Sequence, residues 1–165
     1  MSERKGKLLF FCGKMAAGKS TLSRQLASQE GAVLLVEDEF LERLFAGQIV
    51  DVAAYATYSS RIREALGPHI VSLLSMGISV VLDFPGNTRR QRAWFRRLID
   101  EAGAGHELHF IDASDALCLD QLRHRSKDLP EEGPWTGEAG FHAVTVYFDP
   151  PAADEGFHVI RHERA

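Results

Sequence analysis

The residues with the clearest chemical potential form a short glycine-rich loop near the amino end of the chain. Residues 13–20, GKMAAGKS, match G-x-x-x-x-G-K-[ST] at every fixed position. Two glycines allow backbone angles and close approaches that a Cβ would forbid, so consecutive N–H groups can turn inward around phosphate oxygens. Lys19 is expected to reach the β and γ phosphates, and Ser20 to ligate Mg²⁺. The predicted nucleotide-binding residues are Gly13, Lys14, Met15, Ala16, Ala17, Gly18, Lys19, Ser20 and Thr21.

The segments on either side of this loop have the secondary structure that the motif requires, a strand before it and a helix after it. A strand-like apolar run, Leu8 to Cys12, precedes it, and a helical segment, Ser20 to Ala27, follows it. The positive end of that helix would add to the attraction for phosphate. The alternative is a glycine-rich turn with a solvated lysine, but the flanking strand and helix favour a phosphate-binding loop.

A carboxylate ends a second buried strand. The run Ile78 to Leu82 is followed by Asp83, at the strand end where ligands of open α/β sheets bind. Asp83 is therefore predicted to hold Mg²⁺ directly or through water; the alternative is a cap for the helix starting near Thr88. Residues 83–86, DFPG, also match the D-x-x-G of GTPases. The guanine-reading N-K-x-D is missing, because DASD follows the later strand Leu108 to Ile111, so a GTPase is excluded.

Three acids, Glu37, Asp38 and Glu39, follow the second predicted strand. In phosphoryl transfer to a hydroxyl, a carboxylate near the acceptor orients it and takes its proton. Asp38 is the preferred candidate for this base, although Glu37 and Glu39 stay open. The alternative is that Asp38 caps the next helix while its neighbours favour the helix dipole.

Two arginines, Arg123 and Arg125, close a predicted helix just before an irregular stretch. Residues 127–140, KDLPEEGPWTGEAG, have no clear period and contain Trp135, so a lid is predicted at about residues 126–140. An arginine from a lid can stabilise charge on the transferring phosphoryl group, and Arg125 is the better candidate. The alternative, cations favoured by a helix carboxyl end, carries equal weight.

Five arginines occur in the expected helix 88–102. Helical geometry places all five on the half opposite Trp94, Phe95 and Leu98. Most are therefore expected to be solvated. Arg89 and Arg92 are near enough to Asp83 to contact an anionic substrate, whereas Arg96 and Arg97 are expected to be too remote. The five are Arg89, Arg90, Arg92, Arg96 and Arg97.

Strand-sized apolar runs alternate with helical segments, which is typical of a parallel sheet covered on both faces. The fold class is α/β, and 165 residues indicate a single domain, 1–165. Gly67-Pro68 predicts a kink, or a division into two helices, within residues 52–76. The remaining expected strands are 33–36 and 157–160, and the expected helices are 19–29, 39–46, 52–76, 88–102, 114–125 and 138–147.

Composition excludes several classes of protein. With 45% hydrophobic and 25% charged residues and no apolar run of about 20, the chain is predicted to be globular, not membrane-spanning, and cytoplasmic. The net charge of −4 gives no global attraction to nucleic acid. Cys12 and Cys118 are expected to be reduced core thiols, and the seven histidines lack metal-ligand spacing.

In this order, the loop, the acids, the strand-end aspartate and the arginine-ended helix resemble the small AAA_33-type P-loop kinases. That family includes polynucleotide 5′-hydroxyl kinases, chloramphenicol phosphotransferase and zeta-toxin-like kinases. The segments 122–125, 143–151 and 155–157 resemble the closing portion of AAA family ATPases. The resemblance implies a three-layer P-loop NTPase fold with strand order 2-3-1-4-5. It also implies that Lys19 and Ser20 bind phosphate and Mg²⁺, that Asp38 is the base, that Arg125 belongs to the lid, and that residues 149–156 border the adenine.

The sequence thus favours an ATP-dependent kinase with a hydroxyl-bearing small-molecule acceptor. A polynucleotide 5′-hydroxyl kinase is one alternative, but such kinases carry a basic residue soon after the acid pair, where this chain has Phe40-Leu41-Glu42. A slow ATPase, or an ATP-gated binding module, is another. ATP, Mg²⁺ and the small-molecule acceptor are the expected ligands, and nucleic acid is not favoured.

Overall fold

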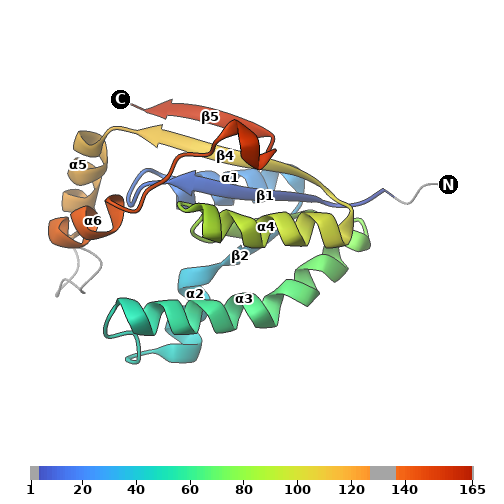
Figure 1. Cartoon of the computed structure of the whole chain (residues 1–165), viewed down its shortest axis with the longest axis horizontal. Coiled ribbons are helices and arrows are strands. Elements are labelled where there is room, and N and C mark those ends of the chain that lie inside the picture. The colour runs from blue at the N-terminus through green and yellow to red at the C-terminus, as the bar shows by residue number, and fades with distance from the viewer. Residues whose placement is uncertain (1–3, 127–136, 165) are drawn as a thin grey trace.

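A computed structural model, which describes residues 4–126 and 137–164, is built around a five-stranded sheet (Figure 1). The strands pair in the order β2-β3-β1-β4-β5, and every pairing is parallel. The expected α/β fold and strand order are therefore confirmed. The strands are β1 (Lys7–Gly13), β2 (Val33–Val36), β3 (Val80–Asp83), β4 (Gly105–Ala113) and β5 (Val159–Arg164).

Helices connect the strands and form the outer two layers (Figure 1). Helix α1 lies behind the sheet in this view, α3 and α4 lie in front of it, and α5 and α6 stand beyond the carboxyl ends of the strands. The helices are α1 (Lys19–Glu30), α2 (Glu37–Phe45), α3 (Val52–Ser75), α4 (Arg89–Ala102), α5 (Asp115–Ser126) and α6 (Glu138–Thr145), with a short 3-10 helix, η1 (Ala153–Glu155).

The two faces of the central strands bury different helices, because successive side chains of a strand point to opposite sides. Leu8, Phe10 and Cys12 of β1 pack with residues of α3 and α4. Leu9 and Phe11 face the other way and pack against α1. Both cysteines are buried free thiols, and burial raises the pKa of Cys12 to about 11. The core therefore fixes β1, and with it the glycine-rich loop that follows this strand.

Two helix boundaries differ from the expectation. The acidic helix begins at Glu37 rather than Glu39, with extended Val36 as the residue before it, so the interpretation of Asp38 as a helix cap is wrong. Helix α3 runs unbroken through Pro68, so the division into two helices is wrong as well. Figure 1 shows the axis of α3 bending in its carboxyl-terminal part, and the buried side of this helix, including Gly67 and Ile70, keeps it packed on the core.

Most of the predicted lid, including Trp135, lies outside the described residues. Its last residues, Glu138 to Gly140, form the first turn of α6. Within residues 4–126 and 137–164, no helix is long and apolar enough to cross a membrane.

Candidate active site

The glycine-rich loop joins the end of β1 to the start of α1 through residues with unusual backbone angles. Gly18 has φ 108°, a conformation that favours glycine, and Ala16 has φ 62°. The N–H of Gly13 donates to the side-chain oxygen of Asn87 at 2.9 Å, and the N–H of Ala17 donates to the Lys14 carbonyl at 3.1 Å. The loop is thus held in a defined turn at the carboxyl edge of the sheet.

The two lysines of the loop have different surroundings. The Lys19 ammonium group donates to the Gly13 carbonyl at 2.6 Å and so lies over the loop, with burial lowering its pKa and the charge of Asp83 acting in the opposite direction. The Lys14 side chain turns away to Asp115, the first residue of α5, at 2.7 Å. Lys19 is therefore the lysine placed to meet phosphate, and Lys14 ties the loop to α5.

Ser20 and Asp83, the two residues predicted to hold Mg²⁺, lie within hydrogen-bond distance of each other. The Ser20 hydroxyl donates to the Asp83 carboxylate at 3.0 Å, and the buried Ser23 hydroxyl lies 3.4 Å from the same oxygen. A hydroxyl and a carboxylate suit Mg²⁺, which takes few protein ligands and completes its octahedron with phosphate and water. The described residues contain no cluster of three His, Cys, Asp or Glu side chains that could hold a metal unaided.

The alternative role for Asp83, as a cap of α4, is wrong. Thr88 occupies that position: its hydroxyl accepts from the N–H of Gln91, and the Gln91 side chain accepts from the N–H of Thr88, which completes a capping box. Asp83 is free of this task and faces the loop.

Asp38 lies in the first turn of α2, where its carboxylate interacts electrostatically with the residues at the loop. Partial burial raises its pKa, and the negative charge of Asp83 raises it further. Lys19 and Arg125 act on it in the opposite direction. The charges of Asp83, Lys19 and Arg125 thus all act on Asp38, although Asp38 lies in α2 and the other three belong to other elements.

Of the two arginines near the end of α5, one is committed to a neighbour. Arg123 is exposed and pairs with Glu138 of α6 at 3.3 Å. Arg125 is also exposed, and its positive charge acts on Asp38 across the site. The two arginines therefore have different surroundings. Arg123 joins α5 to α6, whereas the charge of Arg125 acts on Asp38.

Glu37, unlike its neighbour Asp38, is buried among three donors from one face of α3. Its carboxylate accepts from the Tyr55 hydroxyl at 2.5 Å and the Ser59 hydroxyl at 2.8 Å, and it lies 3.7 Å from Nε of Arg63. Arg63 also donates to the Pro85 carbonyl at 2.8 Å. This Glu37 cluster was missed from the sequence, where the i, i+4, i+8 spacing of the three donors was its only signal.

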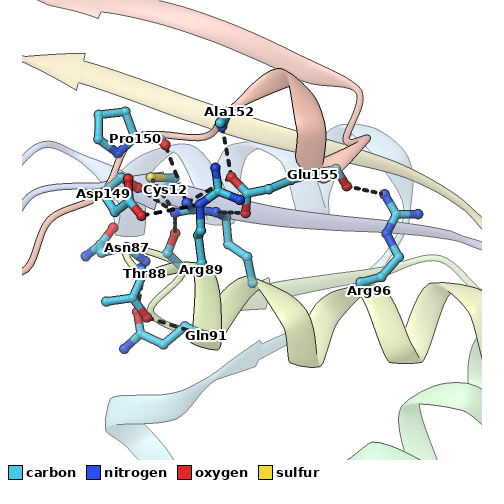
Figure 2. Close-up of polar contacts among 12 residues, drawn as sticks. Cys12, Asn87, Thr88, Arg89, Gln91, Arg96, Asp149, Pro150, Ala152 and Glu155 are labelled. Atoms are coloured by element: carbon cyan, nitrogen blue, oxygen red, sulfur yellow. Dashed lines mark hydrogen bonds and ion pairs between the residues drawn. The ribbon is translucent and has the colours of Figure 1, made fainter.

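Arg92 was predicted to lie on the half of α4 opposite the buried residues, near enough to Asp83 to contact a substrate, and its placement on that exposed half is wrong. Its side chain is completely buried and donates to both carboxylate oxygens of Glu155, at 2.8 and 3.1 Å. It also donates to the carbonyls of Gly86 at 3.0 Å and Asp149 at 2.7 Å, with Cys12 Sγ 3.8 Å away (Figure 2). These residues form the Arg92 cluster. Because every donor has a partner inside the protein, Arg92 is not available to a substrate.

The neighbours of Arg92 on α4 also bind the segment before β5 (Figure 2). Arg89 pairs with Asp154 at 2.8 Å, and Arg96 donates to the Gly156 carbonyl at 2.8 Å. Burial acts to raise the pKa of Glu155, but the hydrogen bonds from Arg92 and from the Ala152 N–H, together with the charges of Arg92 and Arg89, lower it overall. The segment 149–156 therefore packs against α4, and the place beside the adenine that the resemblance implies for it stays a prediction.

A hollow of about 320 Å³ adjoins the loop on the α1 side of the sheet. Thr21, the last predicted nucleotide-binding residue, is part of its wall. The residues lining it come from the loop, α1, α5 and the last two strands: Ala17, Gly18, Thr21, Leu22, Gln25, Ile111, Gln121, His162 and Arg164.

The parallel sheet, the glycine-rich loop between β1 and α1, and the Ser20–Asp83 pair define a P-loop nucleotide-binding protein. A protein-family model described as an AAA domain, AAA_33, matches residues 8–151. The chain belongs to this AAA_33 family. No curated protein matches it in sequence.

Solved structures of kinases share the fold. A presumed kinase from Chloroflexus aurantiacus J-10-fl superposes with a TM-score of 0.74 at 21% identity, covering 97% of this chain and 89% of its own. The APS kinase CysC of Mycobacterium tuberculosis, in complex with AMPPNP and APS, gives 0.64 at 21% identity, with coverages of 98% and 91%. A gluconokinase from Sinorhizobium meliloti 1021 gives 0.60 at 15% identity, with coverages of 96% and 83%.

Proposed function

We propose that this protein is an ATP-dependent kinase that transfers the γ-phosphoryl group to a hydroxyl of a small molecule. The observation that carries the proposal is the geometry at the loop, where Lys19 lies over the Gly13 carbonyl at 2.6 Å and Ser20 donates to Asp83 at 3.0 Å. The raised pKa of Asp38, caused by burial and by the charge of Asp83, supports the proposal. A phosphoryl-transferring site needs these charges together: cations for the phosphates, a metal-binding acid, and a base for the acceptor. The APS kinase and gluconokinase that share the fold agree with this class.

The environments of the three neighbouring acids favour Asp38 as the base. Glu37 is buried, with only 1% of its surface exposed, and is committed to the donors of α3. Glu39 is exposed and lies 3.9 Å from Arg43, one turn along the same helix. Only Asp38 combines exposure to an incoming acceptor with an electrostatic link to the loop.

In the proposed mechanism the N–H groups of the loop and the Lys19 ammonium hold the β and γ phosphates. Ser20 and Asp83 would hold Mg²⁺, which neutralises charge on the phosphates when it is bound. Asp38 accepts the proton of the acceptor hydroxyl as its oxygen bonds to the γ-phosphorus, while the bond from that phosphorus to the bridging oxygen of ADP breaks. Arg125 stabilises the charge that spreads over the transferring group.

The charges beside the site favour a small, non-anionic acceptor over a nucleic-acid end. Arg92 is buried and forms an ion pair with Glu155, and Arg89 pairs with Asp154. The first turn of α2, next to the proposed base, is acidic throughout. A polynucleotide would need free cations for its phosphates, so the 5′-hydroxyl kinase stays a second candidate, which strongly salt-dependent binding would support.

The test compares Asp38→Asn with Glu39→Gln, a matched loss of one carboxylate from the adjacent residue. A cell extract is incubated with ATP and protein, and mass spectrometry identifies metabolites heavier by one phosphoryl group. Asp38→Asn should bind ATP normally and form product about 10²-fold or more slowly, whereas Glu39→Gln should retain transfer. Equal transfer rates in the two variants would reject Asp38 as the base.

A slow ATPase or ATP-gated binding module predicts a different result. The wild-type protein would then release inorganic phosphate without any phosphorylated metabolite in the same incubation. The kinase and the slow ATPase both require that ATP bind at the glycine-rich loop. Lys19→Ala tests this requirement, because loss of this cation should weaken ATP binding itself. Full ATP affinity in Lys19→Ala would contradict the phosphate-binding role of the loop.

A further inference from the structure

Two carbonyl groups of the glycine-rich loop are held by two side chains from distant parts of the chain. Nη1 of Arg164, at the end of β5, donates to the Ala17 carbonyl at 2.6 Å. With its amide oriented to satisfy both neighbours, Gln121 of α5 donates to the Ala16 carbonyl at 2.6 Å and accepts from Nη2 of Arg164 at 3.0 Å. Two consecutive carbonyls of the loop thus share one connected pair of side chains, which we name the Arg164–Gln121 brace.

The brace determines which way two peptide groups of the loop point. In a trans peptide the C=O and the following N–H point in opposite directions. Holding the Ala17 carbonyl toward Arg164 therefore directs the Gly18 N–H away from Arg164. Inward N–H groups are what a phosphate-binding loop offers its ligand.

The brace also supports an unfavourable backbone conformation. Ala16 has a positive φ of 62°, which a residue with a Cβ adopts at some cost in energy. Its carbonyl is the one that Gln121 holds, so the hydrogen bond offsets part of that cost. Without it, other conformations of the loop would gain population at the expense of the phosphate-binding one.

The contact between Arg164 and the loop is close. A Cβ added to Gly18 would come within 2.4 Å of Nη1 of Arg164, so glycine at this position leaves room for the guanidinium as well as for the backbone angle. The end of β5 is fixed in turn, because the N–H of Ser114 donates to the Arg164 carbonyl at 3.3 Å. Arg164 is therefore held on its own strand while it holds the loop.

We propose that Arg164 and Gln121 are positioning residues that set the glycine-rich loop in its phosphate-binding conformation before nucleotide arrives. The inference rests on the proposed function only in requiring that a nucleotide bind at this loop. It assigns the brace no contact with the γ-phosphate. Its effect should therefore appear in the affinity for any nucleotide whose β-phosphate the loop holds, and it should be the same for ATP and ADP.

The test measures dissociation constants of MgATP and MgADP by titration calorimetry in the full chain. Arg164→Ala and Gln121→Ala should each weaken both nucleotides, the former about tenfold or more, because a hydrogen bond from a charged donor is lost. Arg161→Ala is the matched control: Arg161 is an exposed arginine on the same strand that pairs with Asp112 away from the loop. This control should retain wild-type affinity.

Three further measurements separate positioning from other roles. Arg164→Lys should recover part of the affinity, because an ammonium can hold the Ala17 carbonyl but not Gln121 at the same time. The double variant Arg164→Ala/Gln121→Ala should lose less than the sum of the single losses, because both residues act on one loop. Thermal unfolding without nucleotide should change little in either single variant, since both side chains are at or near the surface.

Unchanged affinity in Arg164→Ala would overturn the proposal. So would a loss confined to ATP with no effect of Gln121→Ala, which would instead indicate a direct contact of Arg164 with the γ-phosphate. These measurements need no acceptor, so a wild-type protein that binds nucleotide but transfers no phosphoryl group refutes the proposed kinase activity and leaves the brace standing. A wild-type protein that binds neither nucleotide refutes both.

Discussion

Replacing Glu155 by glutamine should destabilise the protein strongly, because it removes the carboxylate that pairs with a completely buried arginine. Arg92 has no exposed surface, and both oxygens of Glu155 accept from it. Breaking a buried ion pair from one side typically costs about 3–5 kcal/mol, since the remaining charge cannot recover its hydration. Glutamine keeps one acceptor oxygen, so the expected loss in the free energy of unfolding is near the lower end, about 3 kcal/mol.

For a domain of this size, each kcal/mol corresponds to about 2–4 °C in melting temperature, so the midpoint should fall by about 6–12 °C. Circular dichroism melts with and without MgATP provide the assay. Glu155 makes no contact with the glycine-rich loop, so the stabilisation that ATP adds should be the same in Glu155→Gln as in the wild type. Asp154→Asn is the control, because Asp154 pairs with Arg89 at the surface and its loss should shift the midpoint far less.

Two results would refute this reasoning. An unchanged midpoint in Glu155→Gln would mean that the Arg92 cluster does not stabilise the fold. A lost response to ATP would contradict the expectation that Glu155 acts away from the nucleotide, and it would support the place beside the adenine that the family resemblance implied for residues 149–156.

Three other predictions concern acid groups and a histidine. Because the charge of Arg125 lowers the pKa of Asp38, Arg125→Gln should raise that pKa further and move the acid limb of the kcat/KM profile to higher pH; an unmoved limb would contradict the proposed link. Burial lowers the pKa of His109 below its usual 6.5, so the unfolded chain binds the proton more readily and stability should fall below about pH 6.5. Urea unfolding should show a smaller loss in His109→Phe. Ser59→Ala should cost about 1.5–3 kcal/mol in the same assay, because the buried Glu37 carboxylate loses a donor, and a neutral result would show that water replaces it.

The parts of the fold that could be predicted from the sequence are those written in local patterns. Apolar runs of strand length separated by helical segments correctly indicated a parallel α/β sheet, and the resemblance supplied the strand order that the structure confirms. The glycine-rich loop was found because its glycines, lysine and serine are adjacent in the chain. Its conformation depends in part on the positive φ that Gly18 itself permits.

Burial of charged residues could not be predicted in the same way. Helical geometry placed Arg92 on the polar half of α4, yet a segment some 60 residues later covers that half and brings Glu155 to it. A helix drawn alone shows which residues share a face but not what packs against the face. The burial of Glu37 was missed for the same reason, since its donors come from α3.

The sequence by itself determined that this chain has a phosphate-binding loop at the end of a buried strand, because loop and strand are encoded by neighbouring residues. Only the tertiary structure decided how the loop is supported. The carbonyls of Ala16 and Ala17 find their donors in Gln121 and Arg164, more than 100 residues away, and no local pattern marks those partners. Buried or constrained polar groups must be satisfied by whatever the folded chain brings near, and that is settled by packing rather than by spacing.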